Sequence, residues 1–331
     1  MLLHQLKWKR RKQPVLSAMT TTESWCRVGL YNPTVIRVGD RYLMWYVGNS
    51  SLTRESDCKI GIAESYDGIH FTPLSSNPIL TDRDLPAGLP AGSSWQTPHV
   101  MYDDDEGRFR MWFIMSHNGR DPATGRVRPS QINGLGYASS PDGVKWDVHP
   151  EVLYSAGRQP RVYRDGPKAY RMWMGAAPDQ EGGRVGDAVF RFTSSDGLSW
   201  SRDRDPAMLV DLDDRINSVV YPFVVQEIDG YTMWYGCHVD GGIFELFTST
   251  SKDGLAWTHH LDKPAFPATR NPDDFDGRYT STPCVLDDGD RYLLYYSARD
   301  WGNLYRAGDG TIKYDSDGIY RHIGVAVCEK T

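Results

Sequence analysis

The amino-acid sequence predicts an all-β fold, a propeller of five blades, and two observations carry this prediction. A proline stands two residues before a valine at five places that are 65, 62, 62 and 61 residues apart: Pro33, Pro98, Pro160, Pro222 and Pro283. Each is followed by a Gly- or Asp-containing turn and then by an aromatic run such as Tyr42–Tyr46, which is typical of a β-hairpin. A fixed period of this length indicates one supersecondary unit repeated along the chain.

The composition agrees with this fold class. Aromatic residues make up 12% of the chain, and 32 Gly and 20 Pro supply turns. After its hairpin each repeat continues with a third strand and a tight turn. That turn holds an Asp-Gly pair in four repeats: Asp67-Gly68, Asp142-Gly143, Asp196-Gly197 and Asp253-Gly254. Asp hydrogen-bonds locally and Gly adopts positive φ, so we expect these carboxylates to be structural.

The last repeat lacks a fourth strand, and the segment that begins at Trp8 matches the missing piece. We therefore expect the N-terminal strand to close the last blade, which removes exposed sheet edges. The prediction is a single domain over 1–331, with blades at about 31–82, 83–155, 156–211, 212–267 and 268–331, the last completed by 5–17.

Charge and composition limit the classes of partner. A net charge of -6 and a pI near 5.8 predict no general attraction to nucleic acid or to a membrane surface. No apolar stretch has the length of a membrane span, so we expect a cytoplasmic protein. The five cysteines are scattered without CxxC spacing, so we expect neither disulfides nor a metal site, and no cofactor.

The first strand of each repeat should line the central channel. Residues at i and i+2 on a strand point the same way, so the residues on either side of each proline should face the channel together. These pairs are Asn32/Thr34, Thr97/His99, Gln159/Arg161, Tyr221/Phe223 and Thr282/Cys284. His99 could shuttle protons and Arg161 could clamp a carboxylate or phosphate, or both could simply fill a polar channel.

The repeated proline strand, the Met-Trp-Tyr strand and the Ser-x-Asp-Gly-x-x-Trp turn resemble the five-bladed propeller glycosidases of glycoside hydrolase families 43, 32 and 130. The resemblance implies acidic residues just before the prolines of the first three blades. The matching positions are Asn32, Thr97 and Gln159, and none is an acid. It also implies that His99 could touch a structural cation. Because glycoside hydrolysis ordinarily uses two carboxyl groups, the implied acid set is missing from these positions.

Two sets of loops are expected on the face of the propeller where the site should lie: those between the second and third strands of a repeat, and those that lead into the next first strand. These loops offer other acids and aromatic rings. Asp240 and Asp300 are the preferred catalytic candidates with His99, because each closes a loop directly after a strand, beside His238 or Arg299. The remaining loop acids are Glu23, Asp82, Asp84, Asp121, Asp179, Glu181, Asp273, Asp274 and Asp276. We expect the substrate to contact Asn32, Gln159, Arg161, Tyr221, His238, Arg299, Trp95 and Trp301, with the rings stacking on a sugar-like surface.

Three functions follow as alternatives. The first is a carbohydrate-active enzyme of the propeller glycosidase type, acting on a glycoside or a sugar-like small molecule at the central channel. The second is a non-hydrolytic enzyme, such as a lyase, a cyclase or a biosynthetic tailoring enzyme, that uses the channel His and Arg. The third is a non-catalytic sugar-binding propeller. A fold alone does not choose among them.

Overall fold

A computed structural model of the chain describes residues 3–50, 57–89, 92–117, 132–178, 186–210, 218–239, 241–302, 304–306, 311–314 and 320–330. These residues form β-strands with three short 3-10 turns, η1 (Leu3–Gln5), η2 (Ser24–Cys26) and η3 (Asp82–Asp84). The all-β prediction is confirmed. Within the described ranges, no helix has the length and apolar character to cross a membrane.

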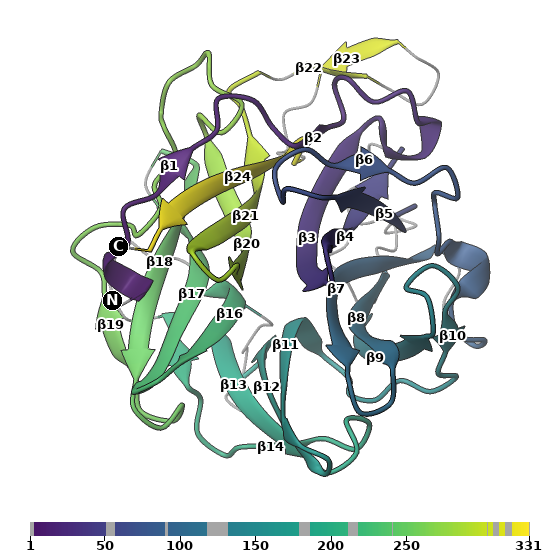
Figure 1. Cartoon of the computed structure of the whole chain (residues 1–331), viewed down its shortest axis with the longest axis vertical. Coiled ribbons are helices and arrows are strands. Elements are labelled where there is room, and N and C mark those ends of the chain that lie inside the picture. The colour runs from purple at the N-terminus through teal and green to yellow at the C-terminus, as the bar shows by residue number, and fades with distance from the viewer. Residues whose placement is uncertain are drawn as a thin grey trace, which may run out of the picture.

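The strands form antiparallel sheets that follow one another along the chain and surround a common centre (Figure 1). The first sheet is β3 (Gly29–Val38), β4 (Arg41–Asn49), β5 (Lys59–Ser65) and β6 (Thr72–Pro73). The second is β7 (Ser93–Asp103), β8 (Arg108–His117), β9 (Ile132–Ser140) and β10 (Asp147–Val148). The third is β11 (Gly157–Gly166), β12 (Ala169–Ala176), β13 (Ala188–Ser194) and β14 (Ser201–Arg202), with β15 (Met208–Leu209) also paired to β13.

The next strands are β16 (Val220–Glu227), β17 (Gly230–Val239), β18 (Ile243–Ser251) and β19 (Thr258–His260). The last group is β20 (Tyr279–Asp287), β21 (Arg291–Arg299) and β24 (His322–Glu329). A single parallel bridge between Phe244 and Tyr279 joins these two groups, and with the N-terminal strands β1 (Lys9–Arg10) and β2 (Leu16–Ser17) they make one nine-stranded sheet. A separate hairpin pairs β22 (Leu304–Arg306) with β23 (Ile312–Tyr314).

The N-terminal segment completes the last sheet, as the sequence predicts. Strands β1 (Lys9–Arg10) and β2 (Leu16–Ser17) both pair antiparallel with β24 (Figure 1). Beyond these pairings, Arg10 Nη1 lies 2.5 Å from Asp276 Oδ2, and the Arg10 guanidinium lies 3.7 Å above the Phe266 ring. Backbone pairing and side-chain contacts therefore both hold the N-terminal segment against the rest of the fold.

The tryptophans of the second strands lock neighbouring sheets together. Trp45, Trp112 and Trp173 are fully buried. Their Nε1 atoms donate to the carbonyl oxygens of the Asp-Gly turns of other sheets, at Gly143 (2.9 Å), Gly197 (2.8 Å) and Gly254 (3.3 Å). In each turn the Asp Oδ1 atom accepts backbone N–H groups two and three residues on, as at Asp142. These repeated carboxylates are therefore structural, as expected.

Strands β3, β7, β11, β16 and β20 lie innermost (Figure 1). Each neighbours the next, and β20 neighbours β3, so they form a closed ring. These are the proline-containing strands of the repeat, and they position the site described next.

Candidate functional site

Each innermost strand is irregular at its proline. The pairing with the second strand shifts register across the proline in all of them, for example between Tyr31 and Thr34. The residue before the proline has positive φ: Asn32 (53°), Thr97 (43°), Gln159 (53°), Tyr221 (61°) and Thr282 (45°). Asn tolerates this region, whereas a β-branched residue such as Thr97 or Thr282 is an outlier that costs about 1–3 kcal/mol. Strain is thus concentrated around the centre of the ring.

These irregular segments surround a central pocket with about 390 Å³ of empty space, part of it open to solvent. The lining residues are Asn32, Pro33, Thr34, Thr97, Pro98, His99, Gln159, Pro160, Arg161, Tyr221, Pro222, Phe223, Thr282 and Pro283. Regular strand alternation would have turned the prolines away from the channel. Because the chain bulges at each proline, the prolines line the pocket together with their neighbours, so strand alternation alone does not describe the lining.

Cys284, which was expected to face the channel, is not one of the lining residues. It is buried, and its Sγ atom accepts the Val35 backbone N–H at 3.3 Å. Burial raises the pKa of this thiol, although the Arg161 charge opposes the shift. Cys284 therefore joins β20 to β3 and presents no thiolate to the pocket.

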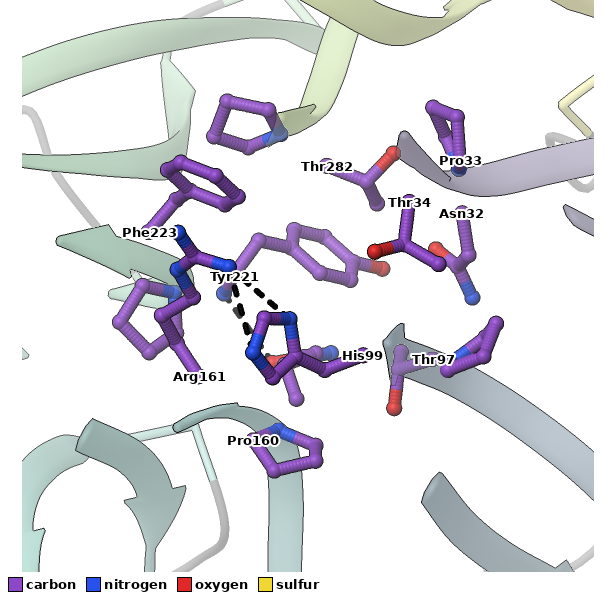
Figure 2. A pocket seen from close by; sticks show the side chains of 14 residues that line it. Asn32, Pro33, Thr34, Thr97, His99, Pro160, Arg161, Tyr221, Phe223 and Thr282 are labelled. Atoms are coloured by element: carbon purple, nitrogen blue, oxygen red, sulfur yellow. Dashed lines mark hydrogen bonds between the residues drawn. The ribbon is translucent and has the colours of Figure 1, made fainter. Parts of the chain in front are cut away.

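Two lining side chains carry buried polar atoms without a partner among the described residues. These atoms are Asn32 Oδ1 and Thr97 Oγ1. The Asn32 side chain is 5% exposed, and its Nδ2 atom makes one long contact of 3.5 Å with Gln96 Oε1. Figure 2 shows Asn32 and Thr97 on the same side of the pocket. A buried polar atom without a hydrogen bond costs about 1–3 kcal/mol, so a ligand group that reached these two atoms through a small shift of the lining would relieve that cost.

His99 and Arg161 meet on the opposite side of the pocket (Figure 2). His99 Nε2 lies 3.0 Å from the Val162 carbonyl oxygen, and Arg161 Nη1 lies 3.0 Å from His99 Nδ1. A carbonyl oxygen only accepts, so Nε2 carries the proton and Nδ1 accepts from Arg161. Burial, together with the Arg161 charge, holds the pKa of His99 well below its ordinary value of 6.5. His99 is thus neutral, and both its nitrogens are engaged.

The remaining contacts of Arg161 are also with the protein. Its Nη2 atom donates to Tyr163 Oη at 3.2 Å, and its guanidinium lies 4.0 Å from the centre of the Phe223 ring. An anion that binds here must compete with these partners for the guanidinium. Arg161 therefore acts first as a link between neighbouring strands of the ring.

Gln159 and Tyr221 complete the expected set at the pocket. Gln159 Oε1 accepts the Tyr221 backbone N–H at 3.0 Å, which satisfies a donor released by the bulge. The Tyr221 ring extends across the middle of the pocket (Figure 2) and packs edge-on against Phe244 at 5.9 Å. Ser297 has the matching role for Asn32, whose backbone N–H it accepts at 2.8 Å. Ser297 was not expected at the site, because nothing in the sequence marks which side chain reaches a bulge.

Asp300, His238 and Arg299 do not line the central pocket. Asp300 contacts Arg321 and lies 3.2 Å from His322 Nε2. His238 packs edge-on against Phe244 at 4.7 Å, and Arg299 is fully buried with its guanidinium 5.7 Å from the centre of the Tyr279 ring. The physical reason is that the second strands lie one position outside the innermost ring. Asp240 lies outside the described residues.

The expected stacking role of Trp95 is wrong. Trp95 is 0% exposed, packs against Phe113 at 4.5 Å and donates from Nε1 to the Thr81 carbonyl oxygen at 2.7 Å. Trp301 is 38% exposed, and its Nε1 atom donates to the Gly277 carbonyl oxygen at 3.0 Å. Trp95 belongs to the hydrophobic core, while Trp301 lies at the surface away from the pocket lining.

No group of three or more His, Cys, Asp or Glu side chains that could hold a metal ion occurs within the part of the chain that the structure describes. At His99, the expected place for a structural cation, the Arg161 guanidinium lies within hydrogen-bonding distance. A metal ion at this place would be repelled by that positive charge.

No protein-family model matches the chain. Two proteins of Mycobacterium tuberculosis, each named an uncharacterized protein (Rv1502 and MT1551), are 26% identical over 266 residues. The match covers 79% of this chain and 64% of each relative, so the chain spans less than two thirds of their length.

Several solved structures are similar to this chain over almost its whole length. A structure named "Glycoside hydrolase" has a TM-score of 0.70 at 16% identity and covers 99% of this chain and 93% of that one. The catalytic domain of the Coprinopsis cinerea GH62 alpha-L-arabinofuranosidase has a TM-score of 0.68 at 12% identity, with 99% and 98% covered. A glycosyl hydrolase from Bacteroides ovatus has a TM-score of 0.67 at 16% identity, with 97% and 93% covered. The chain thus has the fold of the propeller glycoside hydrolases, and the resemblance inferred from the sequence is confirmed at the level of the fold.

Proposed function

We propose that the chain is a five-bladed β-propeller whose central pocket binds a sugar-like small molecule, and that it is carbohydrate-active on a glycoside or a related compound. The observation that carries this proposal is a pair of buried oxygens at the pocket, Asn32 Oδ1 and Thr97 Oγ1, for which the described residues provide no hydrogen-bond partner. A ligand rich in hydroxyl groups can donate to the first and exchange a hydrogen bond with the second. The fold shared with glycoside hydrolases supports the same class of ligand.

The aromatic side chains of the pocket also suit a sugar. Tyr221 and Phe223 present ring surfaces beside the polar groups (Figure 2). Most ligand sites combine apolar and aromatic walls with a few well-placed polar groups. A pyranose has both kinds of surface, with C–H groups on its faces and hydroxyl groups at its edge.

Hydrolysis at this pocket needs two carboxyl groups, one to protonate the leaving group and one to activate water or attack the sugar. The positions where the resemblance implies acids hold Asn32, Thr97 and Gln159, and these side chains line the pocket. Acids for hydrolysis would therefore come from elsewhere. Asp240 and three further loop acids that lie outside the described residues, Asp121, Asp179 and Glu181, remain the candidates.

The second candidate function is binding of a sugar without hydrolysis. The observation that favours it is the engagement of both His99 nitrogens by Val162 and Arg161, which leaves the imidazole no free acceptor for a substrate proton. Under either function we propose that the site works without a metal or other cofactor, because Arg161 supplies the positive charge beside His99. We also propose that the protein is located in the cytoplasm.

The test is a screen of neutral mono- and disaccharides against the full chain. Thermal melting measures binding, because a ligand of the folded state raises the melting temperature with its concentration. Release of nitrophenol from aryl glycosides measures hydrolysis in parallel. Binding with turnover supports the hydrolase, and binding without turnover supports the sugar-binding protein. A chain whose melting temperature responds to no saccharide at millimolar concentration contradicts the proposal.

A further inference from the structure

A serine, a histidine and an aspartate outside the central pocket form a continuous series of hydrogen bonds. Ser17 Oγ on β2 lies 2.9 Å from His322 Nδ1 on β24, and His322 Nε2 lies 3.2 Å from Asp300 Oδ2 after β21. None of these residues lines the central pocket. The pairing of β2 with β24 places Ser17 opposite His322, and the pairing of β21 with β24 places Asp300 beside it.

The protonation states of the three hydrogen-bonded side chains follow from Asp300 at one end of the series and Ser17 at the other. Burial would raise the pKa of Asp300, but the hydrogen bond from His322 and the charge of Arg321 lower it below its ordinary value. An ionised Asp300 accepts the Nε2 proton of His322, which leaves Nδ1 as the acceptor for the Ser17 hydroxyl. The Met19 backbone N–H donates to Ser17 Oγ at 3.1 Å, which favours negative charge on that oxygen.

Ser17 and His322 both line a second pocket, with about 1320 Å³ of empty space, part of it open to solvent. Leu30, Tyr46 and Phe275 contribute apolar surface to its lining. Three consecutive threonines, Thr20, Thr21 and Thr22, also line it. The Phe275 ring packs edge-on against His322 at 5.8 Å and holds the imidazole plane. A hydrogen-bonded nucleophile and base thus open onto a mixed apolar and hydroxyl-lined cavity.

A second Ser–His contact between paired strands provides a comparison within the same molecule. Ser249 Oγ lies 2.8 Å from His259 Nδ1, again across two paired strands, β18 and β19. Among the described residues, His259 has no carboxylate within ion-pair distance, whereas His322 has Asp300. The Ser17 site therefore includes a carboxylate, Asp300, which a simple serine–histidine contact between two strands does not need.

We propose that Ser17, His322 and Asp300 form a second active site that hydrolyses small uncharged carboxylic esters. Ser17 Oγ attacks the ester carbonyl carbon while its proton passes to His322 Nδ1. The tetrahedral intermediate collapses, the bond to the leaving alkoxide breaks, and His322 returns the proton to that oxygen. Water then attacks the acyl-serine with His322 as the base, which releases the carboxylic acid and regenerates Ser17. Asp300 is a positioning residue that holds the histidine tautomer.

The proposal is independent of sugar binding at the central pocket, and covalent labelling tests it. A fluorophosphonate probe, which phosphonylates activated serines, is incubated with the full chain, and the labelled peptide is mapped by mass spectrometry. We expect label on Ser17 in the wild type, none in Ser17→Ala, and rates lower by about 10²–10⁴ in His322→Gln, as for loss of a general base. Ser249→Ala, the matched control, should label like the wild type.

Two further measurements separate catalysis from structure. Asp300→Asn should label at least about tenfold more slowly, and Asp300→Glu should recover part of the rate, because only a carboxylate holds the required tautomer. Hydrolysis of p-nitrophenyl acetate should fall in parallel with labelling. Peptide mapping on the wild type decides the matter even if Ser17→Ala is unstable. A wild type with no label on Ser17, or with equal labelling of Ser17 and Ser249, overturns the proposal and leaves the pair as a clamp between β2 and β24.

Discussion

Arg161 Nη1 lies 3.0 Å from His99 Nδ1, so a guanidinium from one innermost strand is hydrogen-bonded to an imidazole from the next. The pair lies at the central pocket, with the Phe223 ring packed against the guanidinium (Figure 2). A positive charge so close to the ring disfavours a second one, and burial acts in the same direction. The arrangement needs a neutral histidine, which makes it sensitive to acid.

The first prediction concerns pH. The folded-state pKa of His99 lies well below the ordinary 6.5, so the unfolded chain binds the proton more readily than the folded one. The His99 contribution to stability is therefore fully present above pH 6.5 and is lost as the pH falls below that value. Urea unfolding at about pH 7.5 and about pH 5.5, on either side of the ordinary histidine pKa, should show a smaller loss of stability in His99→Gln than in the wild type. Equal losses in the two proteins would mean that His99 titrates normally.

The second prediction concerns a buried ion pair between sheets. Asp103, whose side chain is fully buried, contacts Arg110 Nε at 2.9 Å and Arg164 Nη1 of the next sheet at 2.7 Å. Asp103→Asn leaves two guanidinium groups without their buried carboxylate and should lower the free energy of unfolding by about 3–5 kcal/mol.

Asp105 provides the control, because it contacts the same Arg164 at 2.9 Å while its side chain is 67% exposed. Asp105→Asn should change the free energy of unfolding by less than about 1 kcal/mol. Chemical denaturation of both variants measures the difference. Equal effects would show that burial does not govern this network.

The third prediction concerns closure of the ring. The side chain of Asp276 is 3% exposed and contacts both Arg10 and Tyr296 Oη, the latter at 2.9 Å. Arg10→Ala leaves this carboxylate without its cation and removes the contact with Phe266, so we expect a loss of about 3–5 kcal/mol in unfolding free energy. Lys9→Ala, the neighbouring exposed residue on β1, is the control and should be close to the wild type. A stable Arg10→Ala protein would show that backbone pairing with β24 is sufficient for closure.

The fourth prediction separates the two tryptophans that the sequence placed at the ligand. Trp95→Ala should cost about 3–5 kcal/mol of unfolding free energy, since it opens a cavity in the core beside Phe113. Trp301→Ala should cost much less, because part of the ring already faces solvent. Thermal melting compares them, and a larger loss for Trp301 would contradict the assignment of Trp95 to the core.

The repeat made the fold predictable from the sequence. Five evenly spaced prolines mark the innermost strands, and the Asp-Gly turns and tryptophans mark the contacts between sheets. The N-terminal closure also followed, because the last repeat lacked a strand that Trp8 and its neighbours could supply. These features are local and periodic, so a single sequence displays them.

The site was harder to predict, because it depends on departures from regular strands. Strand alternation places Asn32 and Thr34 on one face, but the bulge at the proline brings Pro33 to the pocket as well. Tyr221 is marked by its place directly before Pro222 and does line the pocket, whereas nothing local shows that Trp95 turns into the core. The Ser17–His322 contact joins two ends of the chain, so no spacing motif could reveal it.

The most direct test of sugar binding at the central pocket is calorimetric titration of the best-binding saccharide from the screen into the wild type, Thr97→Val and Thr72→Val. Thr97→Val removes the buried hydroxyl of the pocket while keeping the shape of the side chain, and Thr72 is an exposed threonine on β6. We expect affinity about 3- to 10-fold weaker for Thr97→Val, as for one lost neutral hydrogen bond, and unchanged affinity for Thr72→Val. Unchanged affinity in Thr97→Val, with the melting temperature preserved, would show that the saccharide does not bind at the central pocket as proposed.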